Sequence, residues 1–370
     1  MIIKNGYVYQ EDQTFQTQDL FVQNGTIVSE SECTDLSSID ASNLYVVPGA
    51  IDVHTHGAAG YDFSDADAAG LSKIAFYLKS QGITTFCPTS MTLPPEKLRS
   101  IFQTLRNVKK SPAHACIAGI HMEGPFLSSQ KKGAQNEDYL LPPDAALFDE
   151  LYSSSQSQIS LITIAPEIPG AFDFIQTVHQ KYPEVHISLG HSATDYMTAM
   201  KAMDLGALHV THLFNAMPPF GHRDPGLIGA ALDHPECMVE AICDGIHICP
   251  TVIRSIFSLF GSDRVILISD SMRAAGLPDG TYEFGGGETV TKKGRRATLP
   301  DGTIAASVTN VMDCMRTAVS FGIPLEQAIA AVTANPAKSI GIYNQTGSLT
   351  PGKRADILLL DQALNLVRII

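Results

Sequence analysis

The sequence lacks the features of several protein classes. Its seven cysteines form no C-x-x-C pair, their number is odd, and most of them lie in apolar runs. This pattern is typical of buried thiols in a reducing cytoplasm and argues against a disulfide framework or a Cys-rich structural zinc site. No apolar run approaches the roughly 20 residues that a membrane-spanning helix needs, and the first residues predict a strand and a turn instead of a signal peptide.

Basic residues are also few. The 25 Lys and Arg residues are outnumbered by 38 Asp and Glu residues, which gives a net charge of −13. A surface of this sign argues against general binding to nucleic acid or to an anionic membrane. It still allows a local basic pocket for a small anion. We therefore expect a cytoplasmic globular protein whose partner is a small molecule.

The two ends of the chain differ from its centre. Residues 1–47 and 347–370 consist of short strands, with Asn-Gly turn signals at 5–6 and 24–25. Between them, apolar strands alternate with amphipathic helices, which predicts parallel strands joined by crossovers. We expect the two ends to pair into one small β-sandwich domain that flanks a barrel over 48–346.

The central part contains eight predicted strands, enough for a (β/α)8 barrel of the α/β class. In such a barrel the active site lies at the C-terminal ends of the strands. A Gly-rich stretch at 280–304 predicts an inserted hairpin, and helices at 307–321 and 325–335 follow it. The strands are expected at 49–54, 82–87, 115–121, 159–165, 185–190, 207–211, 237–243 and 264–269.

A histidine pair ends the first of these strands. His54 and His56 are two residues apart, and because side chains alternate faces along a strand, both imidazoles can point the same way. Such a pair can supply two metal ligands. One of the two could equally be a packed or hydrogen-bonded histidine, and the later strand ends decide between these interpretations.

Four more polar side chains end other predicted strands. Each alone could be an ordinary hydrogen-bonded group, but their shared position at one end of a barrel makes chance placement hard to defend. Imidazole and carboxylate ligands suit Zn²⁺ or Fe²⁺, which lower the pKa of water and polarise a carbonyl oxygen. An aspartate nearby can move a proton to a leaving nitrogen, so we expect hydrolysis of an amide-like bond. The four are Glu123, His191, His212 and Asp270, after the third, fifth, sixth and eighth strands.

A resemblance follows from these motifs taken in order. PGAIDVHTHG, HMEGPF, GHSAT, THLFNAM, DGIH and ISDSM resemble the metal-dependent amidohydrolase superfamily and, within it, the N-acetylglucosamine-6-phosphate deacetylase family. HTHG alone indicates only the superfamily, whereas HMEGPF and THLFNAM together are more specific. The resemblance implies a β-sandwich plus barrel, a homodimer, and hydrolysis of the N-acetyl group to acetate and an amino-sugar phosphate in amino-sugar catabolism.

The resemblance also implies a metal set. Glu123, His191 and His212 would hold the main catalytic ion. His54 and His56 would hold a second ion, with Glu123 bridging the two. Some family members lack the H-x-H pair and use one ion, so its presence here favours two divalent ions per subunit.

Further roles are carried over in the same way. Asp270 would be the general base and acid, and Asn215 and Ala216 would offer amide groups to the phosphate. His247 and Arg223 match phosphate contacts that the neighbouring subunit supplies in family members, which would provide charge-assisted donors to the anion. For Arg223 the residues alone also allow a salt bridge to the adjacent Asp224.

One position departs from the family pattern. The family commonly has a His that contacts the sugar at the end of a KKGAH-like segment, and this chain has Gln135 there. Gln can donate and accept hydrogen bonds but carries no charge. Preference for the galactosamine epimer, as an N-acetylgalactosamine-6-phosphate deacetylase, therefore stays open.

The residues argue against two other functions. A dihydroorotase-like cyclic amidase would bridge its metals through a carboxylated Lys at the end of the fourth strand, where this chain has no Lys. A non-catalytic sugar-phosphate-binding barrel is expected to lose metal ligands or the general base, and this chain keeps them. His121 points to the same side of its strand as Glu123, so it could also be a ligand, but we expect a hydrogen-bonded histidine there.

Overall fold

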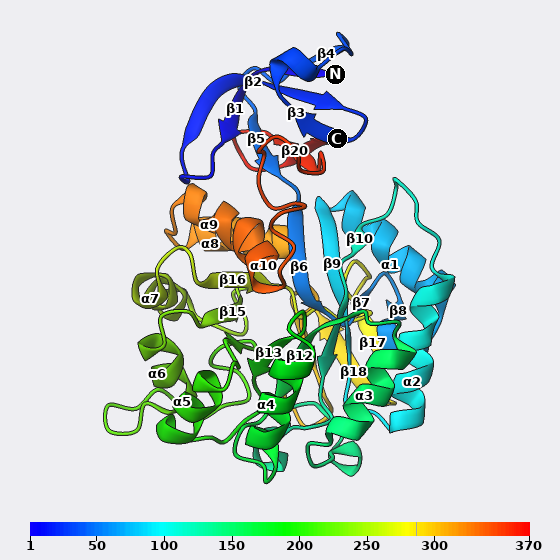
Figure 1. Cartoon of the computed structure of the whole chain (residues 1–370), viewed down its shortest axis with the longest axis vertical. Coiled ribbons are helices and arrows are strands. Elements are labelled where there is room, and N and C mark those ends of the chain that lie inside the picture. The colour runs from blue at the N-terminus through cyan, green and yellow to red at the C-terminus, as the bar shows by residue number, and fades with distance from the viewer. Residues whose placement is uncertain (286) are drawn as a thin grey trace.

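The chain folds into a barrel and a separate sheet. The computed structural model describes residues 1–285 and 287–370. Both chain ends lie in the sheet at the top of Figure 1, and the barrel lies below it. Within the described residues, no helix is both long and apolar enough to span a bilayer.

Eight parallel strands build the barrel, which confirms the predicted fold class. Their side chains are buried along nearly their whole length, as expected when helices cover the outer face. Past the last strand, the Asp270 N–H donates to the His54 carbonyl at 2.9 Å and the His56 N–H to the Ser271 carbonyl at 2.8 Å, and these bonds close the ring. In pairing order the strands are β6 (Ala50–Thr55), β9 (Ile83–Ser90), β11 (Ile120–Glu123), β12 (Ile159–Ile164), β13 (His186–Leu189), β14 (His209–Val210), β15 (Met238–Ile242) and β16 (Val265–Ile268).

The predicted third strand is divided in the structure. Residues 116–117 form β10 (Cys116–Ile117), which pairs with the middle of β9, and β11 begins only at Ile120. Gly119 lies between them where a Cβ atom would come within 2.4 Å of the Ser160 hydroxyl. The close approach of Ser160 in β12 therefore requires glycine at this position.

Helices cover the barrel. Asp67 caps the first one by accepting a bond from the Ala69 N–H at 2.9 Å. The predicted helix at 325–335 ends at Val332, and a further helix begins at Ala334. The helices are α1 (Ala68–Ser80), α2 (Pro95–Thr104), α3 (Ala145–Ser154), α4 (Ala171–Lys181), α5 (Tyr196–Asp204), α6 (Gly226–Asp233), α7 (Pro250–Phe260), α8 (Val311–Ser320), α9 (Leu325–Val332) and α10 (Ala334–Ser339), with 3₁₀ turns η1 (Glu30–Glu32), η2 (Phe63–Asp65), η3 (Leu105–Asn107), η4 (Ser129–Lys131) and η5 (Glu137–Tyr139).

The separate sheet is built from both termini, as predicted. The Asn-Gly pair at 24–25 forms the expected two-residue hairpin, with φ of 51° and 74°. The pair at 5–6 was wrongly predicted as a turn: Asn5 has φ of 63° inside a continuous strand, where the register shifts between Ile3 and Gly6 as in a β-bulge. The strand order is β21 (Leu366–Ile369), β20 (Ile357–Leu360), β5 (Tyr45–Pro48), β1 (Ile2–Tyr9), β2 (Phe15–Gln23) and β3 (Thr26–Val28), and β4 (Ser38–Asp40) also pairs with β1.

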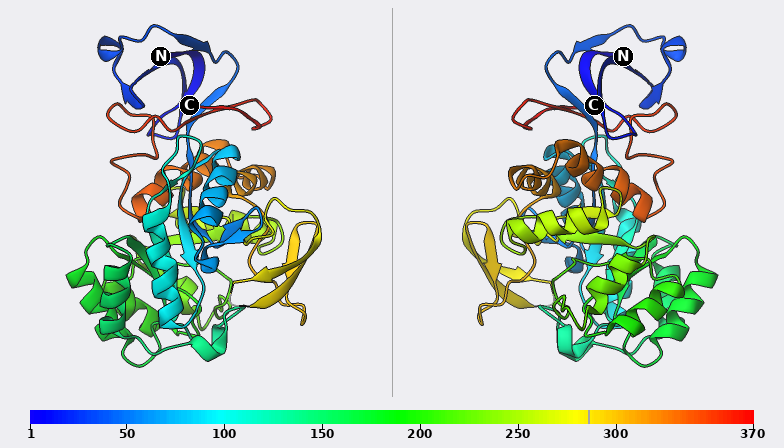
Figure 2. Two further views of the ribbon diagram at one scale, coloured as in Figure 1. Left: turned by 90° about the vertical axis from the view of Figure 1, so that its right-hand side faces the viewer. Right: turned by 90° about the vertical axis from the view of Figure 1, so that its left-hand side faces the viewer.

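The Gly-rich segment after the barrel forms a small antiparallel sheet on one side of the molecule, drawn in yellow in Figure 2. It has a third strand beyond the predicted hairpin, and residue 286 of the predicted stretch lies outside the described residues. The domain limits at 47–48 and 346–347 stay a prediction. The strands are β17 (Gly280–Phe284), β18 (Glu288–Lys293) and β19 (Arg296–Thr298), and a separate short pair is β7 (Gly57–Ala58) and β8 (Tyr61–Asp62).

Candidate metal centre and substrate pocket

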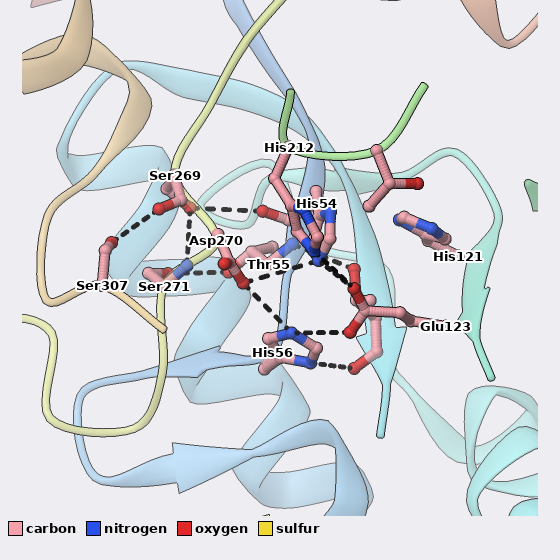
Figure 3. Close-up of polar contacts among 12 residues, drawn as sticks. His54, Thr55, His56, His121, Glu123, His212, Ser269, Asp270, Ser271 and Ser307 are labelled. Atoms are coloured by element: carbon pink, nitrogen blue, oxygen red, sulfur yellow. Dashed lines mark hydrogen bonds and ion pairs between the residues drawn. The ribbon is translucent and has the colours of Figure 1, made fainter. Parts of the chain in front are cut away.

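Glu123 faces the imidazoles of His54, His56 and His212 at the C-terminal end of the barrel (Figure 3). Its Oε1 atom is 3.1 Å from the Nε2 of His191 and 3.2 Å from that of His212. The same oxygen is 3.5 Å from His54 Nε2, and Oε2 is 3.5 Å from His56 Nε2. The structure thus brings together all five residues that the sequence predicted as metal ligands, from four different strand ends.

Hydrogen bonds at Nδ1 fix the orientation of three of these rings. His54 Nδ1 faces the carboxylate of Glu240 at 3.0 Å. His56 and His191 direct Nδ1 at main-chain carbonyls, at 3.2 Å and 3.0 Å. Because a carboxylate or carbonyl only accepts, these contacts assign a proton to Nδ1 and leave Nε2 as the nitrogen of each ring that can bind a metal.

Several Nε2 atoms converge on one small space beside Glu123. The Nε2 atoms of His191 and His212 are 3.0 Å apart, and the Nε2 of His54 is buried with no hydrogen-bond partner in the described chain. A bound cation would satisfy these converging nitrogens and the carboxylate together. The donor set suits a divalent metal. Two triplets have their ligand atoms within 4.8 Å of one another: His54, His56 and Glu123, and Glu123, His191 and His212.

The carboxylates and imidazoles of the site shift each other's pKa values. Burial alone would raise the pKa of Glu123, but the imidazoles of His54 and His191 hold it well below its usual range. Burial would lower the pKa of His54, yet Glu123, Glu240 and Asp270 raise it to about 10. The carboxylates therefore create a negative potential at the imidazoles, which would also favour a metal cation.

Asp270 lies beside the cluster, directly after β16. Its Oδ1 atom is 3.2 Å from His56 Nε2 and 3.5 Å from His54 Nε2 (Figure 3). Burial raises the pKa of Asp270, but these imidazoles outweigh burial and lower it. The carboxylate is therefore ionised near neutral pH and able to accept a proton.

Two of the predicted metal ligands and Asp270 have a left-handed backbone. His191, His212 and Asp270 have φ of 47°, 29° and 46°. A non-glycine residue pays of order 1–3 kcal/mol for such a conformation, and these conformations concentrate at functional sites. The strain lets each side chain turn inward just where its strand ends.

A cavity of about 310 Å³ opens over the cluster. Its volume is at the lower end of the range typical of small-molecule sites, roughly 300–1,000 Å³. Apolar side chains of Met91, Ile242 and Phe284 form part of its wall. Nine of the predicted site residues line it: His56, Glu123, Gln135, His191, His212, Asn215, Ala216, His247 and Asp270.

The geometry agrees with the comparisons to known proteins. A model of the Amidohydrolase family matches residues 45–368. This chain belongs to the amidohydrolase family. The amidohydrolase is 37% identical over 367 residues to an N-acetylglucosamine-6-phosphate deacetylase of Bacillus subtilis (strain 168), a match that spans 97% of this chain and 89% of that protein. It is 32% identical over 345 residues to an N-acetylgalactosamine-6-phosphate deacetylase of Escherichia coli O157:H7, spanning 93% of this chain and 90% of that one.

A solved structure matches the amidohydrolase over its full length. It is N-acetyl-D-glucosamine-6-phosphate deacetylase from Mycobacterium smegmatis, an aspartate-to-alanine mutant in complex with N-acetyl-D-glucosamine-6-phosphate. The TM-score is 0.92 at 29% identity, and the match covers 100% of this chain and 97% of that chain. This likeness confirms the barrel and the terminal sheet.

In the amidohydrolase, only some of the residues predicted to bind phosphate line the cavity. Asn215 lies at the cavity, and its Nδ2 donates to the main-chain carbonyl of His212 at 3.1 Å. His247 also lies there, so it reaches the pocket of its own chain. Burial lowers the pKa of His247, but Asp244, 2.8 Å from Nδ1, raises it further than burial lowers it.

Arg223 lies away from the cavity. It is exposed, and within the described residues it forms no ion pair, so the salt bridge to Asp224 that the residues allowed is not formed. Its contribution to a neighbouring subunit stays a prediction.

Both the amino group and the oxygen of the Gln135 amide form hydrogen bonds within the chain. Its Nε2 donates to Glu123 Oε2 at 2.7 Å, and its Oε1 accepts from the Thr92 N–H at 2.8 Å. The side chain therefore holds a predicted metal ligand, and its predicted contact with the sugar is untested.

Sequence reasoning missed Glu240, which lies 0% exposed in the middle of β15. The available signal was a lone carboxylate inside the apolar run Met238–Ile242. His121 behaves as expected: its nitrogens face the Val53 carbonyl at 3.2 Å and the Thr163 hydroxyl at 2.7 Å, and burial lowers its pKa to about 3.

Proposed function

We propose that this amidohydrolase removes the acetyl group of N-acetylglucosamine 6-phosphate, giving glucosamine 6-phosphate and acetate in amino-sugar catabolism. The observation that carries the proposal is the shared lining of one cavity. Imidazoles around Glu123, the ionised Asp270 and the polar residues Asn215 and His247 all border it. The names of the relatives above support the same substrate.

The metal would be held by the residues that surround Glu123. Glu123, His191 and His212 would bind the main ion, and His54 and His56 a second ion with Glu123 between them. A divalent ion such as Zn²⁺ or Fe²⁺ supplies, when bound, a lowered pKa of water and polarisation of the acetyl carbonyl.

Asp270 performs the proton transfers in this proposal. It is ionised before the reaction, so it accepts the proton of the attacking water. It then delivers that proton to the nitrogen that leaves as the sugar amine. Its Oδ1 lies 3.2 Å from His56 Nε2 and 3.5 Å from His54 Nε2, so the carboxylate is directly beside the residues that would hold the metal.

The phosphate would be held at the polar part of the cavity wall. Protonated His247 would donate a charge-assisted hydrogen bond to it, and Asn215 and Ala216 would offer amide groups. In the predicted homodimer Arg223 would add a charge from the neighbouring subunit. The family pattern assigns His247 to the neighbour as well, but here His247 borders the cavity of its own chain. The homodimer, the cytoplasmic location and the identity of the metal stay predictions.

The test is acetate release from the 6-phosphates of N-acetylglucosamine and N-acetylgalactosamine, with the unphosphorylated sugars as controls. We expect fast turnover of the glucosamine derivative and little turnover without phosphate. A preference for the galactosamine derivative would support the alternative that Gln135 left open. Equal turnover of phosphorylated and free sugars would refute the proposed phosphate site.

A further inference from the structure

Glu240 is a buried carboxylate that the proposed reaction does not use. Its Oε2 faces His54 Nδ1 at 3.0 Å and accepts from the main-chain N–H of His212 at 3.1 Å. Its Oε1 lies 3.2 Å from His209 Nε2. A charge this deeply buried is costly unless it is paired, so these contacts account for its presence. One carboxylate thus touches a residue of each proposed metal triplet.

The contact with His54 decides which nitrogen of that ring is free. Because Glu240 can only accept, it holds the His54 proton on Nδ1. Nε2 then faces Glu123 Oε1 and Asp270 Oδ1, each 3.5 Å away, and is the nitrogen that can bind a metal. Without Glu240, the proton could move to Nε2 and bond to either carboxylate, and His54 would no longer be able to bind a metal.

Glu240 also strengthens His54 as a ligand. A carboxylate accepts the Nδ1 proton more strongly than a neutral amide does, and such a contact raises the basicity of the ligating nitrogen. A Gln at this position keeps the shape of the contact but leaves His54 a weaker ligand.

A separate metal site at Glu240 is not supported. His54, His121 and Glu240 do place ligand atoms within 4.8 Å of one another. However, His121 Nδ1 donates to the Val53 carbonyl, so its Nε2 lone pair is the acceptor for the Thr163 hydroxyl and is already used. Glu240 therefore acts on the ligands around it.

We propose that Glu240 is a positioning residue that builds the half-site of His54 and His56 and thereby sets the number of ions bound per chain. The proposal rests on the metal dependence in the proposed function, but not on the substrate. Carboxylates that orient a ligating histidine typically raise metal affinity about 10–100-fold.

The test is metal binding by Glu240→Gln, which keeps the side-chain shape and removes the charge. Metal-depleted protein is loaded with Zn²⁺, and metal content and affinity are measured by elemental analysis and chelator competition. We expect the second ion to bind about 10–100-fold more weakly, with little change for the first. His56→Asn, which removes a ligand of the same half-site, should give the same stoichiometry. Glu236→Gln, the same change at an exposed position near the start of β15, should bind as the unmodified chain does.

Three results would overturn the proposal: unchanged binding of both ions in Glu240→Gln, loss of both together in a folded variant, or an unmodified chain that binds one ion at saturation. If Glu240→Gln does not fold, nitrogen-15 NMR of the histidine-labelled unmodified protein tests the same point. His54 should be the Nδ1–H tautomer, and an Nε2–H tautomer would refute the assignment. Metal binding is read without substrate, so a failure of deacetylation would not alter these results.

Discussion

Replacing Gln135 by Leu should weaken metal binding more than sugar binding. Leu has a similar size, but it lacks both the N–H donor and the carbonyl acceptor of the amide. Glu123 Oε2 would lose a donor at 2.7 Å, and the buried N–H of Thr92 would lose its acceptor at 2.8 Å. A hydrogen bond to a charged group contributes about 1.5–3 kcal/mol, and an unsatisfied buried group costs about 1–3 kcal/mol. The free energy of unfolding of the metal-depleted protein should therefore fall by about 2.5–6 kcal/mol.

The effect on metal affinity follows from the same contact. Gln135 fixes the rotation of the Glu123 carboxylate, so that Oε1 faces His191 and His212 while Oε2 faces His56. Losing a group that orients a ligand typically lowers metal affinity about 10–100-fold. Chelator competition measures that change, and KM for the sugar phosphate, measured at saturating metal, should change far less.

A matched control lies in the same loop. Gln130 is exposed, so Gln130→Leu makes the identical substitution without touching Glu123. It should leave metal affinity and unfolding unchanged. Unaltered metal affinity in Gln135→Leu, together with a raised KM or a shifted ratio between the two epimers, would refute this reasoning and make Gln135 a sugar contact.

Three more predictions follow from the site. Asp270→Asn should lose activity by orders of magnitude and keep its metal, because the base is lost, and an active variant with normal metal content would contradict this role. His191→Ala should lose the main ion and activity together, and full metal occupancy by elemental analysis would count against it as a ligand. KM should rise as pH increases through the raised pKa of His247, where the cation is lost, and Asp244→Asn should move that rise to lower pH. An identical KM–pH profile in that variant would exclude His247 as a charged phosphate donor.

Much of the site could be predicted because parallel strands end at one rim. His54, Glu123, His191 and Asp270 are far apart in the sequence, but each directly follows an apolar run. Once alternating strands and helices indicate a barrel, the residues after those runs must meet at its C-terminal end. The position of each residue at the end of a predicted strand was therefore enough to predict that these side chains lie close together.

Side-chain partners could not be predicted in this way. The bonds of Gln135 to Glu123 and Thr92 depend on how a loop lies across two strand ends, which no local pattern encodes. Glu240 needs the register between β15 and its neighbours before its contact with His54 appears. The Asn-Gly pair at 5–6 was misleading because a positive φ at Asn5 serves a bulge as well as a turn.

The most direct test of the central claim is acetate release from N-acetylglucosamine 6-phosphate by one metal-depleted sample, measured before and after Zn²⁺ or Fe²⁺ is restored, with the metal content determined in parallel. The account predicts negligible turnover without metal and recovery in proportion to the bound ion. Full turnover by the depleted protein, or none with the metal bound, would contradict it.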